Sequence, residues 1–409
     1  MFPKKPVTIR EVYLDYAAAT PVSQDVLAVM MPYFSDCFAN PSTLYAAGVA
    51  AREAVEQSRC DVASSLCTQP DTIVFTSGGT ESCNLALFGL LSREQGKNKH
   101  IITTKVEHKA VLGPIKQLVQ EGYSVTYLDV DETGQIDIAQ FRKALRPETV
   151  LVSIMYVNNE LGTVYPVQDI GKEILKWRKK HNSVFPYYHI DACQAPLYFD
   201  VSVERLHVDL LSVNGSKIYG PKGIGALYVR RGVAIDPIMV GGGQEHGLRS
   251  GTEHVPGIVG FGQAMDNRQH NDTTVRELRD YFWKEIERTI EAVQLNGIPI
   301  CVSDYDKYGS CNDGDSRSPN NVHVWFHGVE AETLALYLSE YGIMVGIGSA
   351  CTTGTDEDSH VLAACGFTKE RITESVRFTL GAATTKEDID YVVTFLPGIV
   401  EHIRVVQGL

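Results

Sequence analysis

The sequence predicts an α/β protein with two parts. In the large domain a mostly parallel seven-stranded sheet lies between helices, and the smaller domain is α+β. From about residue 70 to residue 230, short β-rich runs alternate with helical patterns. This alternation is typical of βαβ units, whose parallel sheet is covered on both faces. After about residue 264 a long amphipathic helix and a polar stretch interrupt it, which indicates a second structural unit.

The large domain is expected to span residues 16–263. Its strands are predicted where short runs are rich in β-branched and apolar residues. These runs are Thr72–Thr76, His100–Thr104, Ser124–Asp129, Val150–Tyr156, Tyr187–Asp191, Asp209–Val213 and Gly225–Val229. Helices are predicted between many of them, at Glu81–Glu94, Ala110–Gln120, Ile138–Leu145 and Ile170–His181.

The small domain is expected to combine residues 1–15 with residues 264–409. Its predicted elements are a helix at Arg276–Val293, a strand at Asn321–Phe326, a helix at Ala331–Tyr341, a strand at Ser375–Leu380 and a closing helix at Asp388–Ile403. The stretch Ser303–Pro319 is rich in Asp, Ser and Gly, so we expect a polar surface insertion there, facing a partner.

Composition narrows the class of protein. The chain has 409 residues, 44% of them hydrophobic and 21% charged, as in ordinary globular proteins. Its 50 acidic and 37 basic residues give a net charge of −13, which argues against a general nucleic-acid or anionic-membrane binder. Nine scattered cysteines without a CxxC pair indicate reduced thiols in the cytoplasm. No secretory segment and no membrane span is expected, because the apolar run Thr149–Val157 is far shorter than the ~20 residues of a span.

Two strand ends carry candidate ligand-binding residues. Ser77-Gly78-Gly79-Thr80-Glu81 follows a strand and opens a helix, so its backbone N–H groups suit a phosphate. A plain helix cap explains the same residues. Asp191 ends a buried strand at the edge where α/β proteins bind ligands, and its carboxylate suits a protonated ring nitrogen. Capping of the next helix is an equal alternative for Asp191.

Four further residues are candidates for chemistry, and each has an ordinary alternative. Lys217 follows an apolar strand in a Gly- and Pro-rich turn and suits a Schiff base with an aldehyde cofactor, although most loop lysines are simply solvated. Cys351 lies among small and polar residues, where a thiol becomes a nucleophile if its pKa is depressed, and an inert exposed thiol is an equal alternative. Arg377, inside an apolar strand, suits a substrate carboxylate or an internal ion pair. His108 between a strand and a helix is catalytic or structural.

Other catalytic signatures are missing from the sequence. There is no Walker A ending, no GxGxxG fingerprint and no GxSxG nucleophile motif. The Cys and His residues show none of the paired short spacings typical of zinc ligands, so no metal is expected.

Taken together, the candidates resemble a pyridoxal phosphate site, and the chain resembles the cysteine desulfurases of the nitrogen-fixation and iron–sulfur-cluster type. These belong to the class V aminotransferases and have the fold of PLP fold type I. The resemblance extends from Tyr13 to about Pro397 and is poorest at 303–319. It is carried by several motifs in the same order: Tyr13-Leu14-Asp15-Tyr16-Ala17-Ala18-Ala19-Thr20-Pro21, Thr76–Ser82, Val157-Asn158-Asn159-Glu160-Leu161-Gly162, Asp191-Ala192-Cys193-Gln194, Lys217–Gly223, Arg249-Ser250-Gly251-Thr252 and Gly348-Ser349-Ala350-Cys351.

The resemblance implies a role for each site residue. Lys217 binds the cofactor covalently and moves the proton, and Asp191 pairs with the ring nitrogen. His108 stacks on the ring and is a further candidate for proton transfer, so the catalytic residues are Lys217, Cys351 and His108. Asn159 and Gln194 contact the side of the cofactor ring that carries its oxygen. Asn159 and Arg377 together hold the substrate carboxylate. The phosphate is held by Gly79, Thr80, Asn214 and Ser216, and by Thr252 of the other subunit of a homodimer.

The implied reaction takes sulfur from L-cysteine, releases L-alanine and leaves a persulfide on Cys351. The sulfur then passes to an acceptor protein such as an iron–sulfur scaffold, or to a pathway that thiolates cofactors, tRNA or DNA. Gly346, Gly348 and Gly354 are expected to let the Cys351 loop move. Alternatives on the same fold are a selenocysteine lyase, a cysteine β-eliminase and a plain aminotransferase.

One departure from the family pattern leaves a further alternative open. The family usually has Ser-x-His before the lysine, where this chain has Asn214-Gly215-Ser216. Both residues can donate hydrogen bonds to a phosphate, but the cationic option of a histidine is lost. A non-catalytic assembly partner is therefore an alternative from another functional class.

Overall fold

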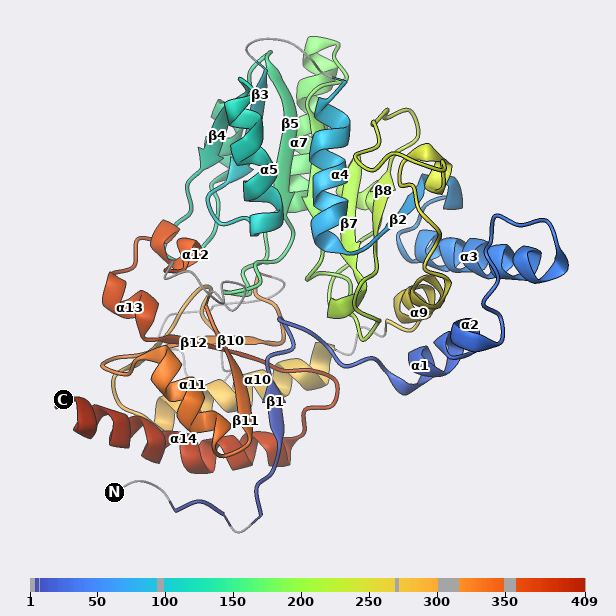
Figure 1. Cartoon of the computed structure of the whole chain (residues 1–409). Helices are drawn as coiled ribbons and strands as arrows, with labels where there is room; N and C mark the ends of the chain where they lie inside the picture. The colour runs from blue at the N-terminus through green and yellow to red at the C-terminus, as the bar shows by residue number, and fades with distance from the viewer. Residues whose placement is uncertain are drawn as a thin grey trace.

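Two β-sheets, each with its own helices, form the molecule (Figure 1). The structure is a computed structural model that describes residues 4–6, 8–93, 99–268, 272–300, 316–348 and 358–408. Among these residues, no helix is both long and apolar enough to span a membrane.

The larger sheet has seven strands in the order β2-β8-β7-β6-β5-β3-β4. The strands are β2 (Ile73–Thr76), β3 (His100–Thr104), β4 (Ser124–Leu128), β5 (Thr149–Met155), β6 (Tyr187–Asp191), β7 (Leu210–Asn214) and β8 (Gly225–Val229). All neighbours are parallel except β8, which is antiparallel to both β2 and β7. The predicted mostly parallel seven-stranded sheet is confirmed.

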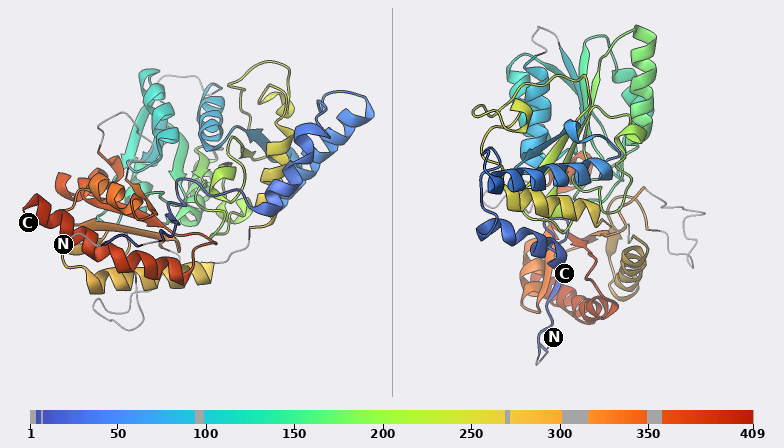
Figure 2. Two further views of the ribbon diagram at one scale, coloured as in Figure 1. Left: turned by 60° about the horizontal axis from the view of Figure 1, so that its bottom comes forward. Right: turned by 90° about the vertical axis from the view of Figure 1, so that its right-hand side faces the viewer.

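Helices cover both faces of this sheet, as the apolar strands require. Every residue of β5 is buried, which is typical of a central parallel strand. In Figure 2 the helices α4 (Gly79–Leu91) and α5 (Lys109–Gln120) lie on one side of the sheet, and α7 (Val167–His181) lies on the other. Two shorter helices complete the crossovers, α6 (Ile138–Ala144) and α8 (Val203–Leu206).

The smaller sheet has five strands in the order β1-β11-β12-β10-β9. These are β1 (Val12–Leu14), β9 (Val293–Leu295), β10 (Asn321–Phe326), β11 (Ile343–Ile347) and β12 (Ser375–Thr379). Only the β1–β11 pair is parallel within this described sheet. Its apolar core is shared with α10 (Asp272–Thr289), α11 (Ala331–Ser339) and α14 (Lys386–Gln407). The N-terminal strand thus lies in the sheet formed by the C-terminal part of the chain.

A separate group of helices extends from one side of the large sheet (Figure 1). It contains α1 (Gln24–Met30), α2 (Pro32–Ser35), α3 (Ala46–Ser65) and α9 (Val255–Asp266). Two short helices, α12 (His360–Ala364) and α13 (Lys369–Thr373), precede β12, and the first residue of α12 lines the pocket described below.

Two expectations are corrected by the structure. The end of the stretch predicted as a surface insertion is buried, because Arg317 is 0% exposed and donates hydrogen bonds to the backbone oxygens of Asn296, Ile298 and Asn321. Residues 303–315 of that stretch lie outside the described residues. Gly346, predicted to give a loop its freedom, is instead part of β11 and packs against neighbouring side chains.

Candidate active site

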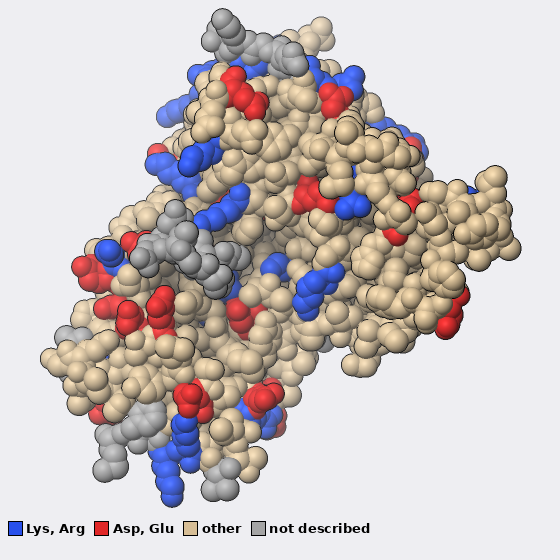
Figure 3. All heavy atoms as spheres, viewed as in Figure 1, with Lys and Arg blue, Asp and Glu red and all other residues tan. Residues whose placement is uncertain are grey.

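A cavity of about 250 Å³ opens between the two sheets. Figure 3 shows the hollow on the face seen in Figure 1, with basic side chains around it. It lies at the carboxyl ends of the parallel strands, where open α/β sheets bind ligands. Nine residues predicted for the site line it: Gly79, Thr80, His108, Asn159, Asp191, Gln194, Asn214, Lys217 and Arg377.

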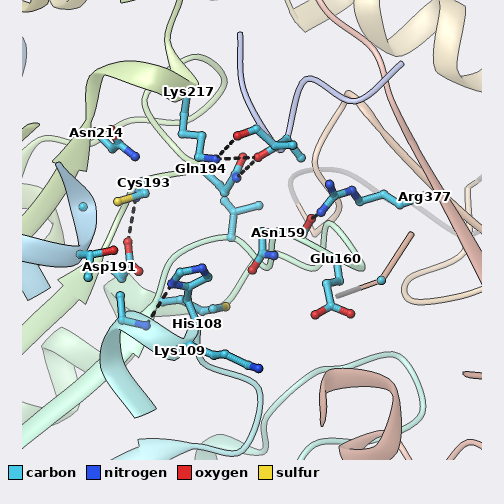
Figure 4. A pocket seen from close by; sticks show the side chains of 18 of the residues that line it. His108, Lys109, Asn159, Glu160, Asp191, Cys193, Gln194, Asn214, Lys217 and Arg377 are labelled. Atoms are coloured by element: carbon cyan, nitrogen blue, oxygen red, sulfur yellow. Dashed lines mark hydrogen bonds between the residues drawn. The ribbon is translucent and has the colours of Figure 1, made fainter. Parts of the chain in front are cut away.

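Lys217 enters the cavity from the turn that follows β7 (Figure 4). Its Nζ donates hydrogen bonds to the backbone oxygens of Ala17, at 3.0 Å, and Ala18, at 2.5 Å. The side-chain Nε2 of Gln194 donates to the same Ala17 oxygen at 2.9 Å. The segment between β1 and α1 therefore forms the wall against which the lysine amine rests.

Asp191 is the last residue of β6 and is 7% exposed. Its Oδ1 accepts a hydrogen bond from the backbone N–H of Cys193 at 3.0 Å. Burial, together with the nearby Asp191 carboxylate, raises the pKa of the Cys193 thiol well above its usual value. A neutral thiol and a buried carboxylate therefore lie side by side at the floor of the cavity.

His108 is the N-cap residue of α5, and its orientation is fixed by that role. Its Nδ1 accepts a hydrogen bond from the backbone N–H of Ala110 at 3.1 Å, so a neutral ring carries its proton on Nε2. The preceding residue, Glu107, is fully buried, and its Oε1 accepts from Thr104 Oγ1 at 2.9 Å and from the Met155 N–H at 3.0 Å. Burial raises the pKa of Glu107 to about 8.

The first turn of α4 forms the end of the cavity nearest Asn214. Gly78, its N-cap, has φ +145° and provides no side-chain cap, so the first N–H groups of the helix are left to other acceptors. A Cβ on Gly79 would lie 2.5 Å from Cys193 Sγ, so any side chain there requires Cys193 to shift. Asn214 Oδ1 accepts from the Ser216 N–H at 3.2 Å. This combination suits an anion.

Arg377 reaches the cavity from β12, on the side opposite Lys217 (Figure 4). It is 3% exposed. Its Nη1 donates to the backbone oxygen of Asn159 at 2.8 Å, and its Nη2 forms an ion pair with Asp15 Oδ1 at 2.6 Å. The internal ion pair that the sequence left as an alternative is therefore present, although the guanidinium still lines the cavity.

Glu160 is a second buried acid at the site. It is 4% exposed, lines the cavity, and its Oε2 accepts a hydrogen bond from Ser359 Oγ at 2.5 Å. Burial raises the pKa of Glu160 to about 7, even though Ser359, Arg377 and other groups act to lower it. Its carboxyl group is therefore shared between proton-bound and ionised forms near neutral pH.

Two predicted residues do not line the cavity, and a third lies outside the described residues. Ser216 lies in the turn before Lys217 and contacts Thr20 through its backbone oxygen. Thr252 is exposed on a different part of the surface of this chain. Cys351 lies outside the described residues, but Gly348, three positions earlier, lines the cavity.

The sequence prediction also missed residues that the fold brings to the site. Lys109, Glu160, Cys193 and His360 line the cavity, Glu107 is buried behind His108, and Asp15 pairs with Arg377. The signal that could have found two of them is an acidic residue beside a site residue in an apolar segment, as Glu107 is beside His108 and Glu160 beside Asn159. Nothing local to Asp15 or His360 in the sequence points to their partners.

Comparison with known proteins agrees with this geometry. The family model of the class-V aminotransferases matches residues 12–392. The chain is 43% identical to the cysteine desulfurase IscS of Dictyoglomus turgidum over 97% of this chain and 96% of the relative. It is 42% identical to a cysteine desulfurase of Nostoc sp., with 96% and 94% coverage. A solved NifS-like protein superimposes with a TM-score of 0.85 at 33% identity, covering 96% of this chain and all of that one. The chain therefore belongs to the aminotransferase class-V family and, within it, to the cysteine desulfurases.

Proposed function

We propose that this protein removes sulfur from L-cysteine, releases L-alanine and passes the sulfur, as a persulfide on Cys351, to an acceptor protein. The observation that carries the proposal is the convergence of Lys217, Asp191 and Arg377 on one cavity from β7, β6 and β12. An amine, a ring-nitrogen partner and a carboxylate-binding fork are the three groups that a pyridoxal phosphate enzyme needs for an amino acid substrate.

The residues present fit pyridoxal phosphate. The cavity has the amine of Lys217 at one wall, the buried Asp191 carboxylate at its floor, and a helix N-terminus without a side-chain cap at its end. A side chain at position 79 would clash with Cys193, and without one the backbone at the start of α4 lines the cavity. Pyridoxal phosphate supplies an electron sink through which the Cα–H and Cβ–S bonds of cysteine can be broken.

We assign the chain's own residues the following work. Lys217 would attach the cofactor and carry the proton to and from the substrate Cα, while Asp191 would pair with the ring nitrogen and keep it protonated. His108 packs on the ring, and its Nε2 holds a proton because Nδ1 is occupied by the helix cap. Gly79, Thr80 and Asn214 would hold the phosphate, and the backbone N–H of Ser216 would orient Asn214 through its hydrogen bond to Oδ1. Asn159 and Gln194 orient the ring oxygen side, and Asn159 with Arg377 binds the substrate carboxylate.

Cys351 is assigned the sulfur transfer. Its thiolate attacks the substrate sulfur, an S–S bond forms as the Cβ–S bond breaks, and the electron pair remains on carbon. Proton uptake there gives the methyl group of alanine. A solved relative titled SspA in complex with cysteine matches 90% of this chain at a TM-score of 0.76 and 37% identity, which supports cysteine as the substrate.

A homodimer in the cytoplasm is part of the proposal. Thr252 is exposed and lies outside its own cavity, as expected of a residue that serves the phosphate of a second subunit. Large apolar side chains are exposed near the N-terminal helices, among them Met31, Phe34, Phe38 and Leu44. A surface of this kind is typical of a subunit interface.

The test is alanine and sulfide release from L-cysteine with a thiol reductant, in wild type and in Cys351→Ala. We expect alanine from the wild type and at least about a hundredfold less from the variant, because the nucleophile is gone. Equal activity would indicate a lyase or eliminase in place of a desulfurase. No turnover in either protein, with the cofactor supplied, would indicate a non-catalytic assembly partner.

A further inference from the structure

One segment of the chain touches both the lysine and the arginine of the site. Residues 15–20, here called the crossing segment, leave β1 and run between the two sheets toward α1 (Figure 1). At one end Asp15 pairs with Arg377, and further along Ala17 and Ala18 accept hydrogen bonds from Lys217. Residues far apart in sequence are thereby held against one short stretch of backbone.

The crossing segment is fixed by its own hydrogen bonds. The Tyr13 hydroxyl donates to the backbone oxygens of Asp15, at 3.0 Å, and Ala19, at 2.9 Å. The Ala17 N–H donates to Thr379 Oγ1 at 2.9 Å, two residues beyond Arg377 on β12. Because both ends are tied, the position of the Asp15 carboxylate relative to β12 is set by backbone rather than by a free side chain.

Asp15 is the carboxylate in direct contact with Arg377 among the residues that the structure describes. The facing residue on β10, His323, offers no charge, because burial and the nearby arginines lower the pKa of its ring to about 3. Glu160, which lines the cavity, interacts electrostatically with Arg377, but the hydrogen bond of its carboxyl group is to Ser359. The orientation of the guanidinium thus depends on Asp15 and on the Asn159 backbone oxygen.

A glycine in the neighbouring strand leaves the space that the Asp15–Arg377 ion pair occupies. Gly346, opposite Arg377 on β11, has no side chain, and a Cβ there would lie 2.6 Å from Asp15 Oδ1 and 2.8 Å from Arg377 Nη2. Arg377 Nε is buried and has no hydrogen-bond partner within the described part of the chain. Nη1 and Nη2 each carry a second N–H beyond the one already committed, and these are donors for an incoming carboxylate.

We propose that Asp15 is a positioning residue that selects substrates with a free α-carboxylate. It holds the fork of Arg377 in one orientation, so that the carboxylate of the amino acid meets two fixed donors. A fork fixed in advance loses less side-chain entropy on binding, and a neutral ester or amide gains little from it. This inference rests on the proposed function, because it takes Arg377 as the binding group for the cysteine carboxylate.

The experiment compares acid and neutral substrates in the holoenzyme. The ratio of kcat/KM for L-cysteine over L-cysteine methyl ester is measured for wild type, Asp15→Ala, Asp15→Ser and Asp15→Asn. Calorimetric affinities for L-alanine and L-alaninamide give the same comparison without turnover. The matched control is Asp71→Ala, which removes an exposed Asp–Arg ion pair with Arg231, 2.7 Å long, far from the cavity.

We expect the acid-over-ester ratio to fall about tenfold or more in the Ala and Ser variants, mainly through KM, since one charge-assisted hydrogen bond no longer orients the fork. Asn keeps an acceptor for Nη2–H, so its ratio should fall only about threefold. The calorimetric acid-over-amide preference should fall in parallel. Asp71→Ala should keep the wild-type ratio.

The outcomes separate this inference from the proposed function. If the wild type neither turns over cysteine nor binds alanine, both are overturned. If the wild type is active but Ala and Ser variants with wild-type thermal midpoints keep or increase the ratio, only the role of Asp15 is overturned. If neither truncated variant folds, an unchanged ratio in Asp15→Asn overturns it. Equal losses on acid and ester would mean a merely structural role.

Discussion

Glu107 shows how burial alone gives a side chain a protonation state that the sequence does not reveal. Its Oε1 accepts two hydrogen bonds, and its Oε2 has no partner among the described residues. Burial, with the Asp191 charge nearby, raises its pKa from 4.5 to about 8. A protonated Glu107 therefore adds no second negative charge beside Asp191 at neutral pH.

This pKa predicts a pH dependence of stability. Between pH 4.5 and about 8 the folded protein holds a proton on Glu107 that the unfolded chain releases, so the contribution of Glu107 to unfolding free energy falls as pH rises. Glu107→Gln copies the protonated acid and cannot ionise. The free energy of unfolding is measured by chemical denaturation for both proteins. As pH rises from 4.5 to about 8, the stability of the variant should increase relative to that of the wild type.

Glu173 on α7 serves as a control, because its pKa is shifted in the opposite direction. Arg142 and Lys176 lower the pKa of Glu173 to about 2, so this group is ionised in both states above pH 5. Glu173→Gln should give a difference from wild type that stays constant between pH 5.5 and 8. A constant difference for Glu107→Gln as well would contradict the buried, protonated state of Glu107.

Among the helices, the start of α4 packs closely against Cys193 at the floor of the cavity. A Cβ on Gly79 would meet Cys193 Sγ at 2.5 Å, but the next atoms, on Asn214, lie at 3.6 Å or beyond. Gly79→Ala should therefore weaken cofactor retention about tenfold, since a clash of one methyl group costs on the order of 1–3 kcal/mol. Retention is measured from cofactor absorbance after gel filtration.

The double variant Gly79→Ala with Cys193→Ala tests this cause directly. Removing Sγ leaves space for the new methyl group, so retention should recover most of the loss. Cys193→Ala alone should retain the cofactor within about threefold of the wild type, because it deletes one buried atom. A double variant no better than Gly79→Ala alone would mean that the clash lies elsewhere.

The elements show where sequence patterns succeed. All seven strands of the large sheet were predicted within one residue of their observed ends. Six of them are runs of mostly buried residues, and the less buried edge strand β4 was predicted from its β-branched and aromatic residues. In the small sheet β1 and β9 were missed, since three residues carry little periodicity. β11 was missed because its glycine was attributed to a loop. α9 contains three glycines, which allow close approach to Met30 and Ser58 but disfavour a helix when read locally.

The candidate site was predictable only in part, for a reason that concerns the whole molecule. Residues that follow a strand or start a helix, such as Lys217, Asp191 and Gly79, carry local signals of function. Contacts between the two sheets do not, since Asp15 and Arg377 lie 362 positions apart in sequence. The sequence pointed to Arg377 as a candidate for binding a carboxylate, but only the fold shows that Asp15 pairs with its guanidinium.

The proposed homodimer gives a prediction at the same scale. Phe38 is 77% exposed beside other exposed apolar side chains of the N-terminal helices. Phe38→Asp should convert a dimer into monomers in sedimentation velocity, and should reduce cofactor retention because Thr252 of the second subunit is withdrawn. Val405→Asp is the control, because Val405 is 67% exposed on α14. A wild-type monomer that retains the cofactor would contradict the shared site.

The central claim is that sulfur from L-cysteine passes to Cys351. It is tested most directly by mass spectrometry of the Cys351 peptide, after the holoenzyme has reacted with L-cysteine in the absence of a reductant. We expect one additional sulfur atom on Cys351, alanine in solution, and neither in Lys217→Ala. Pyruvate and ammonia in place of alanine, with unmodified Cys351, would contradict it.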